Sequence, residues 1–118
     1  MTAIRNFRDL IVWQKAHEFV LVIYHLTKLF PDDEKFGLTS QIRRAAVSVA
    51  ANIAEGFARF GKQDKLRFYN IAQGSLEETK YYLILAKDLG YTKDIVGEGK
   101  LAGDVGRLLY ALMTSIKQ

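Results

Sequence analysis

A cluster of positively charged side chains stands where one amphipathic segment of the sequence ends and the next begins. Arg59, Lys62, Lys65 and Arg67 fall within nine consecutive residues. Arginine grips a phosphate group with two parallel hydrogen bonds, and lysine adds a point charge on a mobile stem. The residue types and spacing therefore favour a surface that binds a polyanion such as the phosphate backbone of a nucleic acid.

Aromatic residues are interleaved with these cations. Phe60, Phe68 and Tyr69 lie in the same stretch of sequence, and an aromatic ring beside phosphate-binding cations can stack on an unpaired base. Phe60 and Phe68, however, continue the apolar periodicity of the flanking helices. The pattern therefore favours a core position for both rings.

Glu55 stands among small residues in the segment NIAEGFAR, where an unpaired buried carboxylate would be costly. Arg59 follows four residues later, in the favourable order for an ion pair on one helix. Asn52 lies on the same helix face and could extend a network. We expect a structural ion pair; the alternative is a carboxylate that binds a partner molecule.

Catalytic and metal chemistry find little support in the residue patterns. Di-iron sites in helical bundles need Glu-x-x-His pairs, and neither His17 nor His25 has a glutamate three residues before it. The chain has no cysteine, and the segment GEGKLA at residues 97–102 matches a dinucleotide-binding fingerprint without the strand that should precede it. We therefore expect no enzyme activity, no cofactor and no metal.

Composition bounds the kind of protein. The chain has 118 residues, of which 49% are hydrophobic and 25% charged, which is typical of one globular domain spanning residues 1–118. The longest unbroken apolar run, FVLVIY, has six residues and is too short to cross a bilayer. A soluble cytoplasmic protein without membrane contact is the expectation. A formal net charge of +4 permits a polyanionic partner but does not require one.

The cations must be positioned by helices, because apolar residues recur at helical spacing throughout. The one proline, Pro31, and nine glycines divide the chain. The predicted helices span residues 9–29, 40–60, 63–89 and 98–116. Short connections predict an all-α, up-down-up-down antiparallel four-helix bundle. Four glycines in the fourth segment each disfavour helix by about 1 kcal/mol relative to alanine, so we expect that helix to start late or to fray.

The second helix has unusually small side chains. Its core stripe is spaced 4-3-4-3-4, the seam of a left-handed bundle. The stripe consists of Ile42, Ala46, Val49, Ile53, Gly56 and Phe60. Alanines cover much of the remaining surface, which indicates that neighbours approach closely on several sides, from the same chain and from another chain. The alternative is that alanine only supplies helix propensity.

Antiparallel helices place the charge excess at one end. There, seven cations face two carboxylates for a net charge of +5, whereas the opposite end sums to 0 and the middle to −1. The cations are Arg5, Arg8, Arg59, Lys62, Lys65, Arg67 and Lys117. The alternative is an ordinary solvated turn kept basic for solubility.

Three longer stretches carry a family resemblance over residues 7–91. They are FRDLIVWQKAHEF, LTSQIRRAAVSVAANIAEGFAR and RFYNIAQGSLEETKYYLILAKDLGY. Together they resemble the four-helix-bundle family of 23S ribosomal RNA intervening-sequence proteins, which is similar to the accessory variability proteins of diversity-generating retroelements. The resemblance implies a bacterial protein, an up-down bundle and a homo-oligomeric ring, commonly a pentamer.

Residues and resemblance together predict a non-enzymatic oligomeric bundle that binds RNA or another nucleic acid through its basic end. The nucleic-acid-binding residues are expected to be Arg5, Arg8, Arg59, Lys62, Lys65 and Arg67, with Asn52 and Glu55 in a structural network. The alternative is a scaffold ring that docks a partner enzyme without binding nucleic acid.

Overall fold

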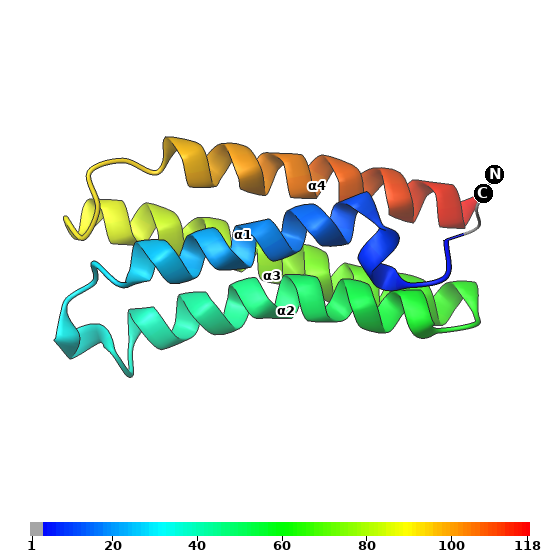
Figure 1. Ribbon diagram of the computed structural model, residues 1–118, viewed down its shortest axis with the longest axis horizontal. Helices are drawn as coiled ribbons and strands as arrows, with labels where there is room; N and C mark the ends of the chain where they lie inside the picture. Colours follow the sequence, from blue (N-terminus) through cyan, green and yellow to red (C-terminus); the bar gives the residue numbers. More distant parts are fainter. Residues whose placement is uncertain (1–3) are drawn as a thin grey trace.

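Four long helices packed side by side make up the computed structural model, which describes residues 4–118 (Figure 1). The helices are α1 (Ile11–Thr27), α2 (Leu38–Ala58), α3 (Lys62–Asp88) and α4 (Val96–Lys117), with the short 3-10 helices η1 (Phe7–Asp9) and η2 (Asp32–Glu34). Successive long helices run in opposite directions (Figure 1). No strand occurs in the part of the chain described, so the predicted all-α four-helix fold is confirmed.

The helix ends follow local chemistry. Pro31 has no amide hydrogen to donate and lies in extended backbone after α1. After α3, Gly90 adopts a φ of 82°, the left-handed region that glycine reaches without strain. The Tyr91 amide then donates to the Ala86 carbonyl at 2.9 Å, and the Gly90 amide donates to the Lys87 carbonyl at 2.9 Å. This pair of bonds is a Schellman motif, which fixes the direction in which the chain leaves α3.

The core stripe of α2 is confirmed as far as Gly56. Ile42, Ala46, Val49 and Ile53 are each 0% exposed, and Gly56 is buried. The predicted core position of Phe60 is wrong, because its side chain is fully exposed (103%). The helix ends at Ala58 and the backbone of Arg59 is extended, so the helical periodicity no longer determines where Phe60 points.

Small residues let α2 and α3 approach closely. A Cβ atom added to Gly56 would lie 2.5 Å from Cε1 of Tyr69, whose side chain is 1% exposed. Farther along, the Ser75 hydroxyl donates to the Ser48 hydroxyl at 2.8 Å. The alanine-rich composition of α2 therefore has a packing role within the chain, in addition to its helix propensity.

The predicted late start of the fourth helix is wrong. Helix α4 begins at Val96, two residues before the expected start, and continues through all four glycines. Ala102, Val105 and Leu109 are each 0% exposed, and tertiary burial of this kind outweighs the unfavourable propensity of glycine. A Cβ at Gly106 would lie 3.5 Å from Cδ2 of Leu76, an ordinary van der Waals contact, so the packing of α4 on α3 does not require glycine there.

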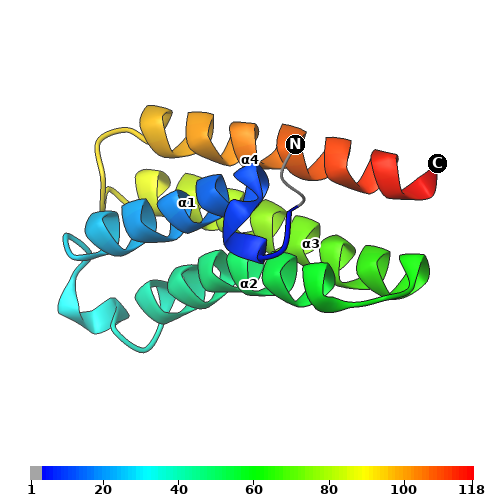
Figure 2. The ribbon, with the colours of Figure 1, turned by 45° about the vertical axis from the view of Figure 1, so that its right-hand side comes forward.

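Helix η1 lies against the side of the bundle, over α2, in both views (Figures 1 and 2). Its Phe7 ring meets the Trp13 ring edge-on, with the ring centroids 5.0 Å apart. The N-terminal segment therefore covers part of the seam between α1 and α2. None of the helices described is long and apolar enough to cross a membrane.

Candidate nucleic-acid interface

Five of the seven predicted cations lie at one end of the bundle. The α2–α3 turn and the end of α4 are at the same end (Figure 1), and the Lys62 ammonium donates to the backbone oxygen of Gln118 at 3.4 Å. We call this end the basic pole. It consists of Arg59, Lys62, Lys65, Arg67 and Lys117, with the carboxylates of Glu55 and Asp64.

Phe68 organises the two arginines of the basic pole. The guanidinium carbons of Arg59 and Arg67 lie 4.5 and 4.7 Å from the centroid of its ring. Arg59 donates to Glu55 at 2.8 Å, and Arg67 donates to Asp64 at 3.4 Å, each through Nη2. A guanidinium has five N–H donors, so each stacked arginine keeps edge donors that can reach a phosphate.

The Arg59 guanidinium is the more constrained of the two. Its Nε is buried and has no hydrogen-bond partner within residues 4–118, whereas the Arg67 side chain is 62% exposed against 41% for Arg59. Because a bound phosphate needs solvent-facing donors, Arg67 is the better placed ligand.

Lys65 has a structural position. Its ammonium donates to the carbonyl oxygens of Gly56 at 3.2 Å and Phe57 at 2.8 Å. These carbonyls lie in the last turn of α2, where a positive charge is favourable, and the Gly56 carbonyl also accepts from the Arg59 amide at 3.2 Å. Lys65 therefore caps α2 and has fewer donors left for a phosphate than the sequence suggested.

Arg5 and Arg8 come from the N-terminal segment and η1, whereas the other predicted cations flank the α2–α3 turn. Arg8 is fixed through its backbone: its amide donates to Oδ1 of Asn6 at 2.9 Å, and its carbonyl accepts from Gln14 at 2.8 Å. Both arginines are exposed. In the described chain no ion pair or hydrogen bond connects their side chains with the basic pole.

The two predicted network residues of α2, Asn52 and Glu55, belong to separate groups of hydrogen bonds. Glu55 and Arg59 form the expected ion pair at 2.8 Å, but the Glu55 side chain is 54% exposed, so it is not a buried carboxylate. Asn52 belongs to another network. Its amide donates to the Ser48 carbonyl at 2.8 Å and to the Ser48 hydroxyl at 3.0 Å, toward α3.

The aromatic residues of this end differ sharply in environment. Tyr69 is buried beneath Gly56, and burial raises the pKa of its hydroxyl, so it cannot stack on a base. Phe68 is half-buried and holds the two guanidiniums. Phe60, in the turn between α2 and α3, is fully exposed.

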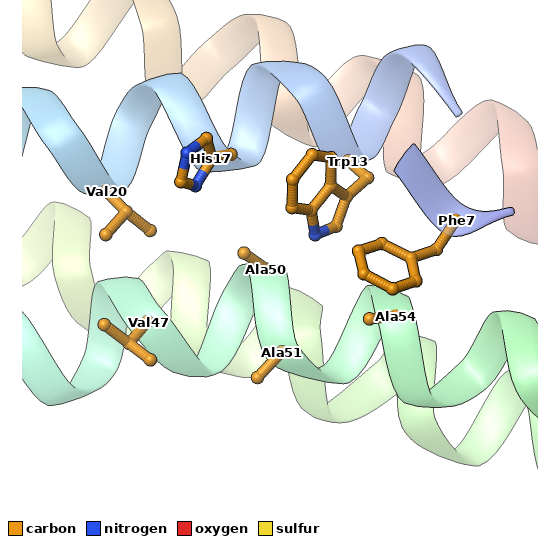
Figure 3. A pocket seen from close by; sticks show the side chains of 8 residues that line it. All are labelled: Phe7, Trp13, His17, Val20, Val47, Ala50, Ala51 and Ala54. Carbon is orange, nitrogen blue, oxygen red and sulfur yellow. The ribbon is translucent and has the colours of Figure 1, made fainter. Parts of the chain in front are cut away.

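An apolar groove between α1 and α2 is a second surface feature (Figure 3). It has a volume of about 370 Å³. Its lining consists of Phe7, Trp13, His17, Val20, Val47, Ala50, Ala51 and Ala54. The Trp13 and His17 rings stack with centroids 5.0 Å apart and planes within 6°. The small side chains of α2 gave a partial signal for this groove, but the position of Phe7 across it could not be predicted from periodicity.

Metal chemistry gains no support from the geometry. Among residues 4–118, no three His, Asp or Glu side chains gather closely enough to hold a metal ion.

A family model and solved structures both match this chain. The family model of the 23S rRNA-intervening sequence proteins matches residues 8–103. A crystal structure of a protein of unknown function from the S23 ribosomal protein family of Bacteroides thetaiotaomicron VPI-5482 is similar, with 26% identity and a TM-score of 0.80. The similarity covers 87% of this chain and 98% of that one. No curated protein matches. The four-helix fold and the family match over most of its length show that this chain belongs to the 23S rRNA-intervening sequence protein family.

Proposed function

We propose that this protein is a non-enzymatic, oligomeric helical bundle that binds RNA through its basic pole. The observation that carries the proposal is the pair of guanidiniums held over the Phe68 ring, at 4.5 and 4.7 Å. Stacking restricts the arginine heads before any ligand arrives, which reduces the entropy lost when a phosphate binds.

Charge balance also supports a polyanionic ligand. The basic pole holds five cations and two carboxylates. Both carboxylates pair with arginines through exposed contacts, and exposed pairs of this kind are weak. A phosphate group can therefore compete for the arginines without a large cost in folding stability.

The proposal is tested by the binding of a labelled RNA hairpin, measured by fluorescence anisotropy across a salt series. The test variant combines Lys62→Gln with Arg67→Gln, which leaves the caps of α2 intact. The control variant combines Lys28→Gln with Lys93→Gln, two exposed lysines at the opposite end of the bundle. Both variants lose two positive charges, so the change in net charge is the same.

We expect the wild type to bind with a steep salt dependence. The variant Lys62→Gln/Arg67→Gln should bind more weakly and lower the slope of log K against log salt by about 1 for each phosphate contact removed. Equal weakening by the control variant would show that only net charge matters. Absence of binding at low salt would contradict the proposal.

We also propose that copies of this chain associate through the apolar groove. Phe7, Ala51 and Ala54 continue from the groove into a neighbouring hollow with Glu55 and Ala58, so the apolar surface runs along the exposed side of α2. Leu21 on α1 and Val47 on α2 are also exposed, at 57% and 41%. Association would repeat the basic pole in one particle and raise its avidity for a long polyanion.

The groove also favours a second candidate function, a scaffold that docks a partner protein without binding nucleic acid. The two functions differ in salt response, because an apolar contact does not weaken steeply with salt. A protein that assembles but binds no RNA at low salt would support the scaffold.

A further inference from the structure

Phe60 occupies an unusual position for a large apolar side chain. It lies in the three-residue connection between α2 and α3, where Arg59 and Gly61 both have extended backbone. Its side chain is 103% exposed, the highest value among the exposed hydrophobic residues described. A Cβ added to the neighbouring Gly61 would have no atom within 4 Å apart from its chain neighbours, so the turn itself is uncrowded at that position.

The ring makes no contribution to the core of the single chain, since it lacks burial there. Isolated exposed apolar residues are common on protein surfaces and need no explanation by themselves. The neighbourhood of Phe60 is what distinguishes it. Arg59 precedes it in the chain and Lys62 follows two residues later, with Arg67 on the next turns of α3.

The other rings at this end are occupied. Phe68 carries the guanidiniums of Arg59 and Arg67, Tyr69 is buried, and the ring of Phe57 lies 5.5 Å from the Lys65 ammonium. Among the four aromatic side chains of residues 57–69, Phe60 has the one fully exposed ring.

We propose that Phe60 stacks on an unpaired base while the cations of the basic pole hold the neighbouring phosphates. The ligand class is single-stranded nucleic acid, including the loops of folded RNA. Bases in a continuous duplex already stack on one another, so they offer no free face to the ring. Phenylalanine has no hydrogen-bonding group, and the stacking is therefore insensitive to base identity. This inference rests on the proposed function, because the cations supply the phosphate contacts.

Phe36 offers a matched control. It is also an exposed phenylalanine (88%) in a turn, and Lys35 lies beside its ring at 5.5 Å. It follows the acidic residues Asp32, Asp33 and Glu34, which repel phosphate. Phe60→Leu and Phe36→Leu remove the same aromatic ring from opposite ends of the bundle and keep an apolar side chain.

The experiment compares a labelled 12-nucleotide poly(U) strand with an RNA duplex of the same length, for the wild type, Phe60→Leu, Phe60→Trp and Phe36→Leu. We expect Phe60→Leu to weaken single-strand binding roughly five- to a hundredfold while leaving duplex binding and the salt slope unchanged. Phe60→Trp should preserve or strengthen single-strand binding, and Phe36→Leu should match the wild type. In a strand that contains 2-aminopurine, the wild type should change the fluorescence of the base and Phe60→Leu should not.

Several results would overturn the inference. Equal losses for strand and duplex, or no loss in Phe60→Leu, would show that the ring does not stack on bases. A changed particle mass in Phe60→Leu, measured by light scattering, would identify a contact between copies of the chain. The wild type and Phe60→Leu are also sedimented with vesicles of 70% phosphatidylcholine and 30% phosphatidylserine. If the wild type sediments with them and Phe60→Leu does not, while RNA binding is intact in both, Phe60 makes a membrane contact.

The outcome also separates this inference from the proposed function. Salt-sensitive RNA binding that does not depend on Phe60 would remove the stacking role and leave the basic pole as a phosphate site. A wild type that binds neither RNA at low salt would remove both.

Discussion

At the scale of single residues, the contact between Gly56 and Tyr69 determines how closely α2 and α3 pack. The glycine is buried and its missing side chain is replaced by the edge of the tyrosine ring. Because Tyr69 is 1% exposed and enclosed by the core, it has little room to move away. The lack of a side chain at position 56 is therefore a packing requirement.

Gly56→Ala should destabilise the protein even though alanine is the better helix former. The new Cβ would lie 2.5 Å from Cε1 and 2.8 Å from Cδ1 of Tyr69, and overpacking of a core costs about 1–3 kcal/mol. The gain in helix propensity is about 1 kcal/mol, so the net free energy of unfolding should fall. Thermal unfolding followed by circular dichroism provides the measurement.

Gly74→Ala is the matched control within the neighbouring helix. Gly74 is exposed in α3, and a Cβ there would meet no atom within 4 Å. This variant should gain up to about 1 kcal/mol of stability from propensity alone. A stabilised Gly56→Ala would show that the packing of Tyr69 is looser than the contact indicates.

Residue chemistry predicted part of the candidate site. The spacing of Glu55 and Arg59 predicted their ion pair, because residues four apart meet on any helix. The cap made by Lys65 and the stacking of both arginines on Phe68 depend on how the α2–α3 turn folds back, which periodicity does not describe. The exposure of Phe60 was missed for the same reason, since the apolar spacing continues in the sequence beyond the last helical residue.

At the scale of elements, one carboxylate, that of Glu34, joins two turns at the end opposite the basic pole through two hydrogen bonds. The Leu38 amide, at the start of α2, donates to Oε1 of Glu34 at 3.0 Å. The Tyr91 hydroxyl, from the connection between α3 and α4, donates to Oε2 of the same carboxylate at 2.7 Å. Glu34 therefore caps α2 and holds the α3–α4 turn in place.

The ionised form of Glu34 should contribute to stability in a pH-dependent manner. The Leu38 amide, followed by the Tyr91 hydroxyl, lowers the pKa of the Glu34 carboxyl below its ordinary value of 4.5. A lowered pKa in the folded state means that the stabilisation is present above about pH 4.5 and is lost as the pH falls through the folded value. Glu34→Gln should be less stable than the wild type at pH 7, and the difference should shrink below pH 4.5.

Urea unfolding at pH 7, 5, 4 and 3, at one protein concentration, measures this convergence. Glu78→Gln removes an exposed carboxyl from α3 and should leave the pH dependence of the wild type in place. A constant difference between Glu34→Gln and the wild type across this pH range would contradict the assigned role of the ionised carboxylate.

Helix positions were the most predictable elements, because each helix has enough apolar residues to show its period. The start of α4 was not predictable from propensity. Its glycines disfavour an isolated helix, but Ala102, Val105 and Leu109 are completely buried against the other helices. Such burial is a property of the assembled bundle, so it carries no local signal in the sequence.

At the scale of the whole molecule, charged and apolar surfaces lie on different parts of the bundle. One end gathers cations around Phe68, and the side of the bundle between α1 and α2 remains apolar. Small side chains face both α3 and the groove, so α2 can pack on two sides at once. This arrangement is the physical basis for expecting a further protein surface against the groove.

Ala51→Glu should dissociate the proposed assembly without unfolding the single chain. Ala51 is exposed in the chain described and lines the groove, so a carboxylate there remains solvated in the monomer. In an apolar interface the same charge would be desolvated without a partner, which is strongly unfavourable. Light scattering should give a mass of 13.4 kDa for this variant and a multiple of that mass for the wild type, with unchanged helical circular dichroism in both.

Ala111→Glu introduces the same charge at an exposed position of α4, away from the groove, and should assemble as the wild type does. An assembled Ala51→Glu would place the interface elsewhere, and a monomeric wild type over a wide concentration range would contradict association.

The RNA affinity of the monomeric variant then measures how much the repetition of the basic pole in the assembly adds to binding. If the basic pole acts polyvalently, Ala51→Glu should bind a long RNA more weakly while binding a short one equally well, because a short strand reaches one pole in either form.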